Sequence, residues 1–203
     1  MFAGKPVIGI VGGIGSGKSF VADLFGEQGC LVTKADELVA QVYARPEIRR
    51  ILEQWWGQQA FTVSGEVNRK WIAGRVFADP GELKMLESVI HPAVSQLRDG
   101  LMNDHARDAA ILAFVWDTPL LFEVGHDQQC DAVVFVETPL EVRQRRVLEA
   151  RGWDSEELLR RENMQMALDK KRLLAHYMVV NTADAAFARR QVGTVLSRVL
   201  KRD

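Results

Sequence analysis

The stretch "VGGIGSGKSF", residues Val11–Phe20, decides the fold of this chain. It fits the pattern G-x-x-x-x-G-K-[ST] of a phosphate-binding loop (P-loop) through Gly12, Gly17, Lys18 and Ser19. The apolar run Val7–Val11 precedes the motif and a helical pattern follows it, which is the context that a P-loop requires. The motif therefore predicts a loop between a strand and a helix that surrounds a phosphate.

The chemistry of this loop is specific. Its glycines let backbone N–H groups turn inward around a phosphate, and the N-terminus of the following helix adds partial positive charge. We expect Lys18 to reach the β- and γ-phosphates of a nucleotide and Ser19 to ligate Mg²⁺. A Gly-rich turn without a ligand is the alternative, and the flanking strand and helix patterns disfavour it.

Composition limits the class of protein. The chain has 203 residues, of which 47% are hydrophobic, enough for one core with insertions. Lys and Arg (26) nearly balance Asp and Glu (27), so the net charge of -1 gives no general attraction to nucleic acid or to acidic membranes. No stretch approaches the roughly 20 apolar residues that span a bilayer. We expect a cytoplasmic monomer that binds neither nucleic acid nor membrane.

Short apolar runs alternate with helix-like segments along the chain. They lie at Val7–Val11, Cys30–Val32, Ala109–Trp116, Ala132–Val136 and Tyr177–Val180. The alternation predicts an α/β fold with a five-stranded parallel sheet flanked by helices. About seventy residues separate the second run from the third, far more than one crossover needs, so an insertion is expected there. Because Pro92 would interrupt a helix, we expect two helices or a kink near His91-Pro92 in this insertion.

Three further features point to the chemistry of a transfer. Asp117 ends the third run and is a candidate to organise Mg²⁺, with an ordinary strand-end Asp as the alternative. Asp36 follows the second run, where it is either a general base for an acceptor hydroxyl or a helix N-cap, and spacing does not distinguish these. The Arg-rich stretch Glu141–Arg172 is either a lid or a solvated charged face.

Motifs spread over nearly the whole chain resemble those of one family. They are "IGIVGGIGSGKS", "KADELVAQV", "VNRKWIAGRVFADP", "LESVIHP", "WDTPLLFE", the Arg-rich stretch and "MVVNTAD". Together they are similar to the dephospho-CoA kinases, which are small P-loop kinases. The "HP" followed by "D-x-PLLFE" is the most diagnostic part, because neither element belongs to the general P-loop pattern.

The resemblance implies ATP-dependent phosphorylation of the ribose 3′-hydroxyl of dephospho-CoA, which gives CoA and ADP in the final step of coenzyme A biosynthesis. It implies ATP and Mg²⁺ as cofactors and three parts. These are a P-loop core (1–36, 109–140 and 173–203), a helical insertion that binds dephospho-CoA (37–108), and a helical lid (141–172). The rival hypotheses are another small-molecule or nucleotide kinase on the same core, or a non-catalytic nucleotide-binding module.

The resemblance also implies roles for particular residues. The residues implied to bind ATP are Gly13, Ile14, Gly15, Ser16, Gly17, Lys18, Ser19 and Asn181. Those implied on the acceptor side are Asp36, Arg69, His91, Asp117, Pro119, Leu120, Phe122 and Glu123. Arg146 and Arg151 resemble lid arginines that act in catalysis with Lys18 and Asp36, and Gln165 with Lys170 or Lys171 matches a "Q…K" motif. Leu120 and Phe122 are alternatively core residues, and His91 is alternatively a structural cap.

The chain departs from the family pattern at three places. Lys34 stands where the first acid of "DAD" is expected, Phe20 replaces a small hydroxyl residue, and "AH" at Ala175-His176 replaces "AD". None of these changes removes a candidate catalytic group. Lys34 weakens any mechanism in which two acids share the role of base.

Overall fold

The computed structural model describes residues 1–182 and 184–201, so predictions that include Ala183, Arg202 or Asp203 lie outside the described residues at those positions. Five parallel strands form one sheet in the order β2-β3-β1-β4-β5. Their bounds are β1 Val7–Gly12, β2 Cys30–Lys34, β3 Ala113–Asp117, β4 Ala132–Glu137 and β5 Tyr177–Val180. The predicted five-stranded parallel sheet is confirmed.

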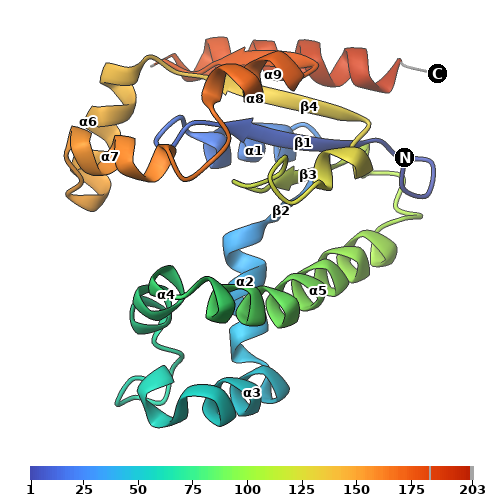
Figure 1. The fold of residues 1–203 in the computed structure, drawn as a ribbon. Helices are drawn as coiled ribbons and strands as arrows, with labels where there is room; N and C mark the ends of the chain where they lie inside the picture. Colours follow the sequence, from blue (N-terminus) through green and yellow to red (C-terminus); the bar gives the residue numbers. More distant parts are fainter. Residues whose placement is uncertain (183, 202–203) are drawn as a thin grey trace. The chain divides into compact units, whose positions relative to one another are not determined.

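Helices connect and flank the strands (Figure 1). Those near the sheet are α1 Lys18–Gly26, α6 Leu140–Arg151, α7 Ser155–Glu162, α8 Leu168–Leu174 and α9 Ala185–Leu200. Those between β2 and β3 are α2 Ala35–Ala44, α3 Pro46–Trp56, α4 Arg69–Ala78 and α5 Pro80–Asp104, and short 3-10 turns occupy Gly57–Ala60 (η1) and His126–Gln129 (η2).

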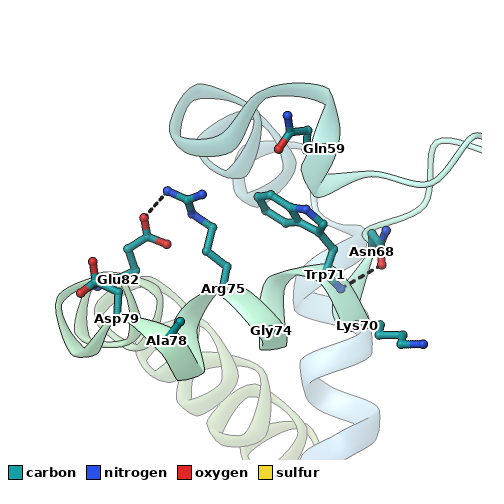
Figure 2. A pocket seen from close by; sticks show the side chains of 9 residues that line it. All are labelled: Gln59, Asn68, Lys70, Trp71, Gly74, Arg75, Ala78, Asp79 and Glu82. Atoms are coloured by element: carbon teal, nitrogen blue, oxygen red, sulfur yellow. Dashed lines mark hydrogen bonds and ion pairs between the residues drawn. The ribbon is translucent and has the colours of Figure 1, made fainter.

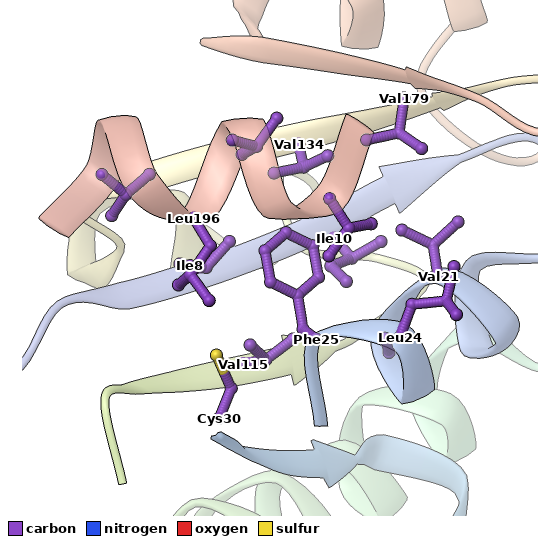
Figure 3. Close-up of a cluster of buried hydrophobic side chains, with 14 of the residues drawn as sticks. Ile8, Ile10, Val21, Leu24, Phe25, Cys30, Val115, Val134, Val179 and Leu196 are labelled. Atoms are coloured by element: carbon purple, nitrogen blue, oxygen red, sulfur yellow. The ribbon is translucent and has the colours of Figure 1, made fainter. Parts of the chain in front are cut away.

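Both faces of the sheet are buried, which explains why its strands read as continuous apolar runs. Successive residues of β1 point to opposite faces. Ile8 and Ile10 pack with Phe25 of α1 and Leu196 of α9 (Figure 3), whereas Val7 contributes to a second cluster on the other face. The sheet is therefore a rigid central layer, and β1 carries the P-loop at its end.

The chain divides into two compact units, residues 1–34 with 102–203, and residues 35–101. The insertion predicted over 37–108 begins two residues after the start of the second unit and ends seven residues after its end. This unit is helical and has a hydrophobic core of its own, built around Val42, Leu52, Trp56, Ile72 and Ile90.

Of the two alternatives predicted near Pro92, two separate helices or a kink, the first was wrong. One helix, α5, runs without a break from Pro80 to Asp104. A proline in a helix removes one backbone hydrogen bond, which packing on both sides can offset. Leu86 and Ile90 before Pro92, and Leu97 after it, belong to the same hydrophobic cluster, so the apolar face continues through the proline.

Candidate active site

The P-loop follows β1 and adopts a conformation that only glycine tolerates at several positions. Gly15 (φ 76°) and Gly17 (φ 82°) lie in the left-handed region, where a side chain is strained. At Gly17 an added Cβ would lie 2.3 Å from Asn181 Nδ2. The glycines of the motif are thus required both by backbone conformation and by the close approach of a neighbouring side chain.

The Ser16 carbonyl group is the point at which other elements support the loop. Asn181 Nδ2 donates a hydrogen bond to this oxygen at 2.8 Å, and Thr138 Oγ1 lies 3.0 Å from it. Arg146 of α6 donates to the same carbonyl at 3.3 Å and to Thr182 O at 2.9 Å. Asn181 and Arg146, both named from the sequence, therefore contact the backbone in and around the loop.

Lys18 begins α1 and turns back onto the loop. Its Nζ donates hydrogen bonds to the carbonyl oxygens of Gly12 and Gly13, at 3.1 and 3.0 Å. These weak neutral acceptors are ones that a phosphate can replace, because phosphate oxygens carry charge and bind ammonium groups more strongly.

Positive charge gathers around Lys18. Burial lowers its pKa to about 8; Asp117 opposes this shift, while the positive charges of Lys171 and Arg151 lower the pKa further. The negative charges of Asp117 and Glu162 offset part of the repulsion among these cations. This arrangement is typical of a polyphosphate site.

Ser19 and Asp117 offer two oxygen atoms beside the loop. Ser19 Oγ donates a hydrogen bond to Asp117 Oδ2 at 2.5 Å, and β3 aligns Asp117 with Ile10 of β1. Among the described residues no three His, Cys, Asp or Glu side chains gather as a metal site. Mg²⁺ needs only one or two protein oxygens because it keeps water and phosphate ligands, so this pair fits Mg²⁺.

The segment after β3 is tied to α8 by a buried lysine. Lys171 is fully buried, and its Nζ lies 2.8 Å from Glu123 and 3.1 Å from Gln165 Oε1. Of the two lysines that could match the "Q…K" motif, Lys171 is the one that makes these contacts. Burial alone would raise the pKa of Glu123, but hydrogen bonds from Lys171 and from the Met166 N–H hold that pKa below its ordinary value.

The other residues of "PLLFE" divide between core and surface. The carbonyl of Pro119 lies 3.4 Å from Lys171 Nζ, and Phe122 packs partly against the second sheet-face cluster. Leu120 is 39% exposed, so its interpretation as a core residue was wrong; the neighbouring Leu121 is the fully buried one. In this irregular segment no periodicity could have distinguished the two leucines.

The Arg-rich stretch is helical and only partly a solvated face. Arg160 is exposed, in agreement with that alternative, whereas Arg143 is buried and donates a hydrogen bond to the P-loop at Ile14 O. Arg151 lies over the ring of Trp153 at 4.7 Å. Sequence reasoning missed Arg143, because nothing in the mixed charge pattern separates it from the neighbouring arginines.

A second residue that the sequence did not reveal is Glu162, at the end of α7. Its Oε1 accepts a hydrogen bond from the Ile14 N–H at 3.0 Å and forms an ion pair with Arg143. The pair thus contacts both polar groups of one P-loop residue. Glu162 is one of many acidic residues in the stretch, and its role depends on tertiary packing that no local pattern encodes.

Three predicted acceptor-side residues lie in the second unit. Asp36 is the second residue of α2 and is exposed, which places it inside the first turn rather than at the N-cap position. Arg69 begins α4, and its guanidinium lies 5.3 Å from the centre of the Tyr43 ring. His91 is exposed in the middle of α5, so the interpretation as a helix cap was wrong.

The second unit also contains a cavity of about 760 Å³ along α4 (Figure 2). Trp71 and Arg75 project from α4 on the side of Gln59, and Arg75 pairs with Glu82 at 2.5 Å. A smaller cavity of about 300 Å³ is lined in part by Arg69. The unit therefore has concave surfaces with aromatic and cationic side chains, which is what a nucleotide-like acceptor would require.

Of the three departures from the family pattern, Lys34 and His176 contact neighbouring elements and Phe20 lies at the surface. Lys34 forms an ion pair with Asp23 of α1 at 2.6 Å. The ring of His176 accepts a hydrogen bond from the Val133 N–H at 3.0 Å and thereby ties the segment before β5 to β4. Phe20 is 39% exposed on α1. None of these observations removes a group from the P-loop.

Fold and site together define the class of protein. A P-loop joins β1 to α1, an acidic residue ends the adjacent β3, and basic side chains of α6 contact the loop. This is the architecture of a P-loop kinase. Shikimate kinase from Acinetobacter baumannii has the same fold, with a TM-score of 0.54 at 19% identity over 100% of this chain and 98% of that one.

The particular family follows from closer relatives. The family model described as dephospho-CoA kinase matches residues 6–186. A dephospho-CoA kinase from Syntrophotalea carbinolica is 36% identical over 96% of this chain and 92% of its own length. The crystal structure of TT1252 from Thermus thermophilus is 36% identical, with a TM-score of 0.80 over 96% of this chain and 97% of that one. The chain belongs to the dephospho-CoA kinase family.

Family membership confirms the predicted activity class. The chain is a phosphotransferase with an alcohol acceptor, and as a kinase it uses ATP. Within the described residues, no helix is both long and apolar enough to cross a bilayer.

Proposed function

We propose that this protein transfers the γ-phosphoryl group of ATP to the ribose 3′-hydroxyl of dephospho-CoA, giving CoA and ADP. Membership of the dephospho-CoA kinase family carries the choice of acceptor, and the bond between Ser19 and Asp117 beside the half-buried Lys18 supports the transfer. This bond brings a cation and two hard oxygen ligands to the loop that binds nucleotide phosphates in this class of enzyme. The reaction completes coenzyme A biosynthesis, and we propose that the enzyme acts as a cytoplasmic monomer that binds neither nucleic acid nor membrane.

On the donor side, residues 13–19 hold the phosphates of ATP. The loop N–H groups and Lys18 bind the phosphate oxygens. Asn181 supports the loop through Ser16 O, and we propose that it also contacts the adenine. Ser19 and Asp117 would hold Mg²⁺, which when bound neutralises phosphate charge.

The Arg-rich stretch, residues 141–172, acts as a lid. Arg146 is already hydrogen bonded to the loop backbone, and Arg151 lies close enough to Lys18 to influence its pKa. Guanidinium groups at these positions stabilise negative charge on the transferring phosphoryl group, and closure excludes water from the reaction.

On the acceptor side, residues 37–108 hold dephospho-CoA, with contacts from Arg69 and His91. Pro119, Leu120, Phe122 and Glu123 add contacts from the segment after β3, which the buried Lys171 fixes in place. Asp36 orients the 3′-hydroxyl and accepts its proton as the phosphoryl group transfers. Its carboxylate is exposed and therefore accessible to a substrate.

The test measures ADP formation by purified protein with Mg-ATP and a panel of alcohols and nucleotides. Dephospho-CoA should be the preferred acceptor. Preference for another acceptor would favour a different kinase. ATP binding without transfer in a single turnover would favour a non-catalytic module.

The base is tested by Asp36→Asn, with Glu37→Gln as the matched control on the next residue. Asp36→Asn should lower turnover on the order of 10² to 10⁴ and leave ATP affinity unchanged, because only proton transfer is lost. The control should retain turnover within a few-fold. Unchanged turnover in Asp36→Asn would remove Asp36 from the mechanism.

A further inference from the structure

Glu162 and Arg143 enclose one residue of the P-loop. Glu162 Oε1 accepts a hydrogen bond from the Ile14 N–H at 3.0 Å, and Arg143 Nη1 donates one to Ile14 O at 3.3 Å. The two side chains also form an ion pair with each other and are only 12% and 8% exposed. A carboxylate of the Arg-rich stretch therefore takes a backbone N–H of the phosphate loop.

The carboxylate lies directly against the loop. A Cβ added to Gly13 would lie 2.9 Å from both Glu162 Oε1 and Arg143 Nη1, so no heavy atom fits between them and the backbone. The charge of Glu162 is also near enough to act on Lys18. A negative charge thus stands at the loop whose N–H groups and lysine are suited to phosphate oxygens.

A carboxylate oxygen and a phosphate oxygen compete for the same kind of partner. Both are anionic acceptors of N–H hydrogen bonds, and two of them at one loop repel each other. Arg143 can donate to either anion, because a guanidinium group pairs with carboxylates and with phosphates. Replacing one by the other keeps the buried arginine neutralised, which limits the cost of the exchange.

We propose that Glu162 is a built-in competitor of the nucleotide phosphates. ATP displaces its carboxylate from the loop, and Arg143 then pairs with the phosphates in place of Glu162. Glu162 and Arg143 would thus set the affinity for ATP, and the Glu162 carboxylate would leave the Ile14 N–H when ATP binds. This inference rests on the proposed binding of ATP by the P-loop.

The alternative is a static role, in which the pair merely holds the loop in shape. The two roles predict different signs for single substitutions. In a competitor pair, loss of the Glu162 charge strengthens ATP binding, whereas loss of Arg143 weakens it. In a static pair, both losses loosen the loop and weaken binding.

The experiment is calorimetric titration of Glu162→Gln and Arg143→Gln with Mg-ATP and with adenosine. Glu162→Gln should bind Mg-ATP about three- to tenfold more tightly and Arg143→Gln about tenfold more weakly, with adenosine affinity unchanged in both. Glu156→Gln makes the same charge change at an exposed position of α7 and should match the wild type. Thermal unfolding of each variant checks its fold.

Weaker or unchanged ATP binding in Glu162→Gln would overturn the proposal. If that variant fails to fold, Glu162→Asp, which keeps the charge but is one methylene shorter, should still tighten ATP binding, and weaker or unchanged binding would again overturn it. Wild-type protein that binds no ATP would instead contradict the proposed function. The two failures are therefore distinguishable.

Discussion

The P-loop unit and the helical unit 35–101 place polar side chains differently. The buried polar or charged residues among those described in the P-loop unit are Ser16, Thr33, Asp117, Thr138, Arg143, Lys171 and Asn181, whereas the helical unit has Arg98. Buried polar groups need partners, and most of these find them in the loop or in side chains around it. The donor site is therefore preorganised, whereas the helical unit keeps most of its polar groups at the surface.

The largest effect on turnover should come from Lys18, whose ammonium group is held at the donor site although burial disfavours its charge. Lys18→Met should lower turnover by at least about 10²–10³, as expected for losing one charge-stabilising group. It should also raise the free energy of unfolding at pH 7 by on the order of 1 kcal/mol, because the fold no longer has to bury a charged ammonium group. Partial solvation of Lys18 keeps this increase small.

Lys84→Met makes the same change at an exposed position of α5 and should alter neither turnover nor stability appreciably. Steady-state kinetics and urea unfolding measure both quantities. A destabilised Lys18→Met variant would show that the bonds from Lys18 to Gly12 and Gly13 outweigh its burial.

The pH dependence of the P-loop unit should follow from the same lysine. Because the pKa of Lys18 is lowered to about 8, kcat/KM for ATP should fall about tenfold per pH unit above that value. Unfolding restores the pKa toward 10.5, so the unfolded chain binds more protons between pH 8 and 10.5 and the contribution of Lys18 to stability rises with pH there.

Lys18→Arg is the control for this profile, since arginine stays protonated over the whole range. Its kcat/KM should be lower but flat through pH 8. A wild-type profile that is also flat would assign the catalytic charge to another group.

The ion pairs of the two units should differ in their contribution to stability. Lys171→Met removes a fully buried partner of Glu123 and should lower the free energy of unfolding by about 3 kcal/mol. Glu82→Gln breaks the Arg75–Glu82 pair of the helical unit, where Arg75 is 46% exposed, and should leave the urea midpoint unchanged.

Acid should reduce the difference in stability between Lys171→Met and the wild type. The pKa of Glu123 lies below its ordinary value, so the pair stabilises the fold above that range and is lost as the pH falls through the lowered pKa. Equal urea midpoints for Lys171→Met and wild type at pH 7 would contradict this account.

The sequence predicted the sheet and the donor loop because both depend on local pattern. Five apolar runs and G-x-x-x-x-G-K-S leave few alternatives for strand, turn and helix. Arg143 and Glu162 could not be found in this way, because their burial depends on how α6 and α7 pack on the loop. The continuous α5 was missed because the rule for Pro92 is local, whereas the packing that sustains the helix is not.

The last comparison adds one methyl group to a glycine in each unit. Gly17→Ala puts alanine at φ 82° and its Cβ 2.3 Å from Asn181 Nδ2, so it should lower the free energy of unfolding by about 2 kcal/mol. Gly74→Ala, in α4 with open space around it, should raise it by about 0.5–1 kcal/mol. Urea unfolding of Gly17→Ala in an Asn181→Ala background separates the two causes. The Asn181→Ala background relieves the clash but not the backbone strain, so part of the lost free energy of unfolding should be recovered. No recovery would assign the whole loss to the left-handed backbone.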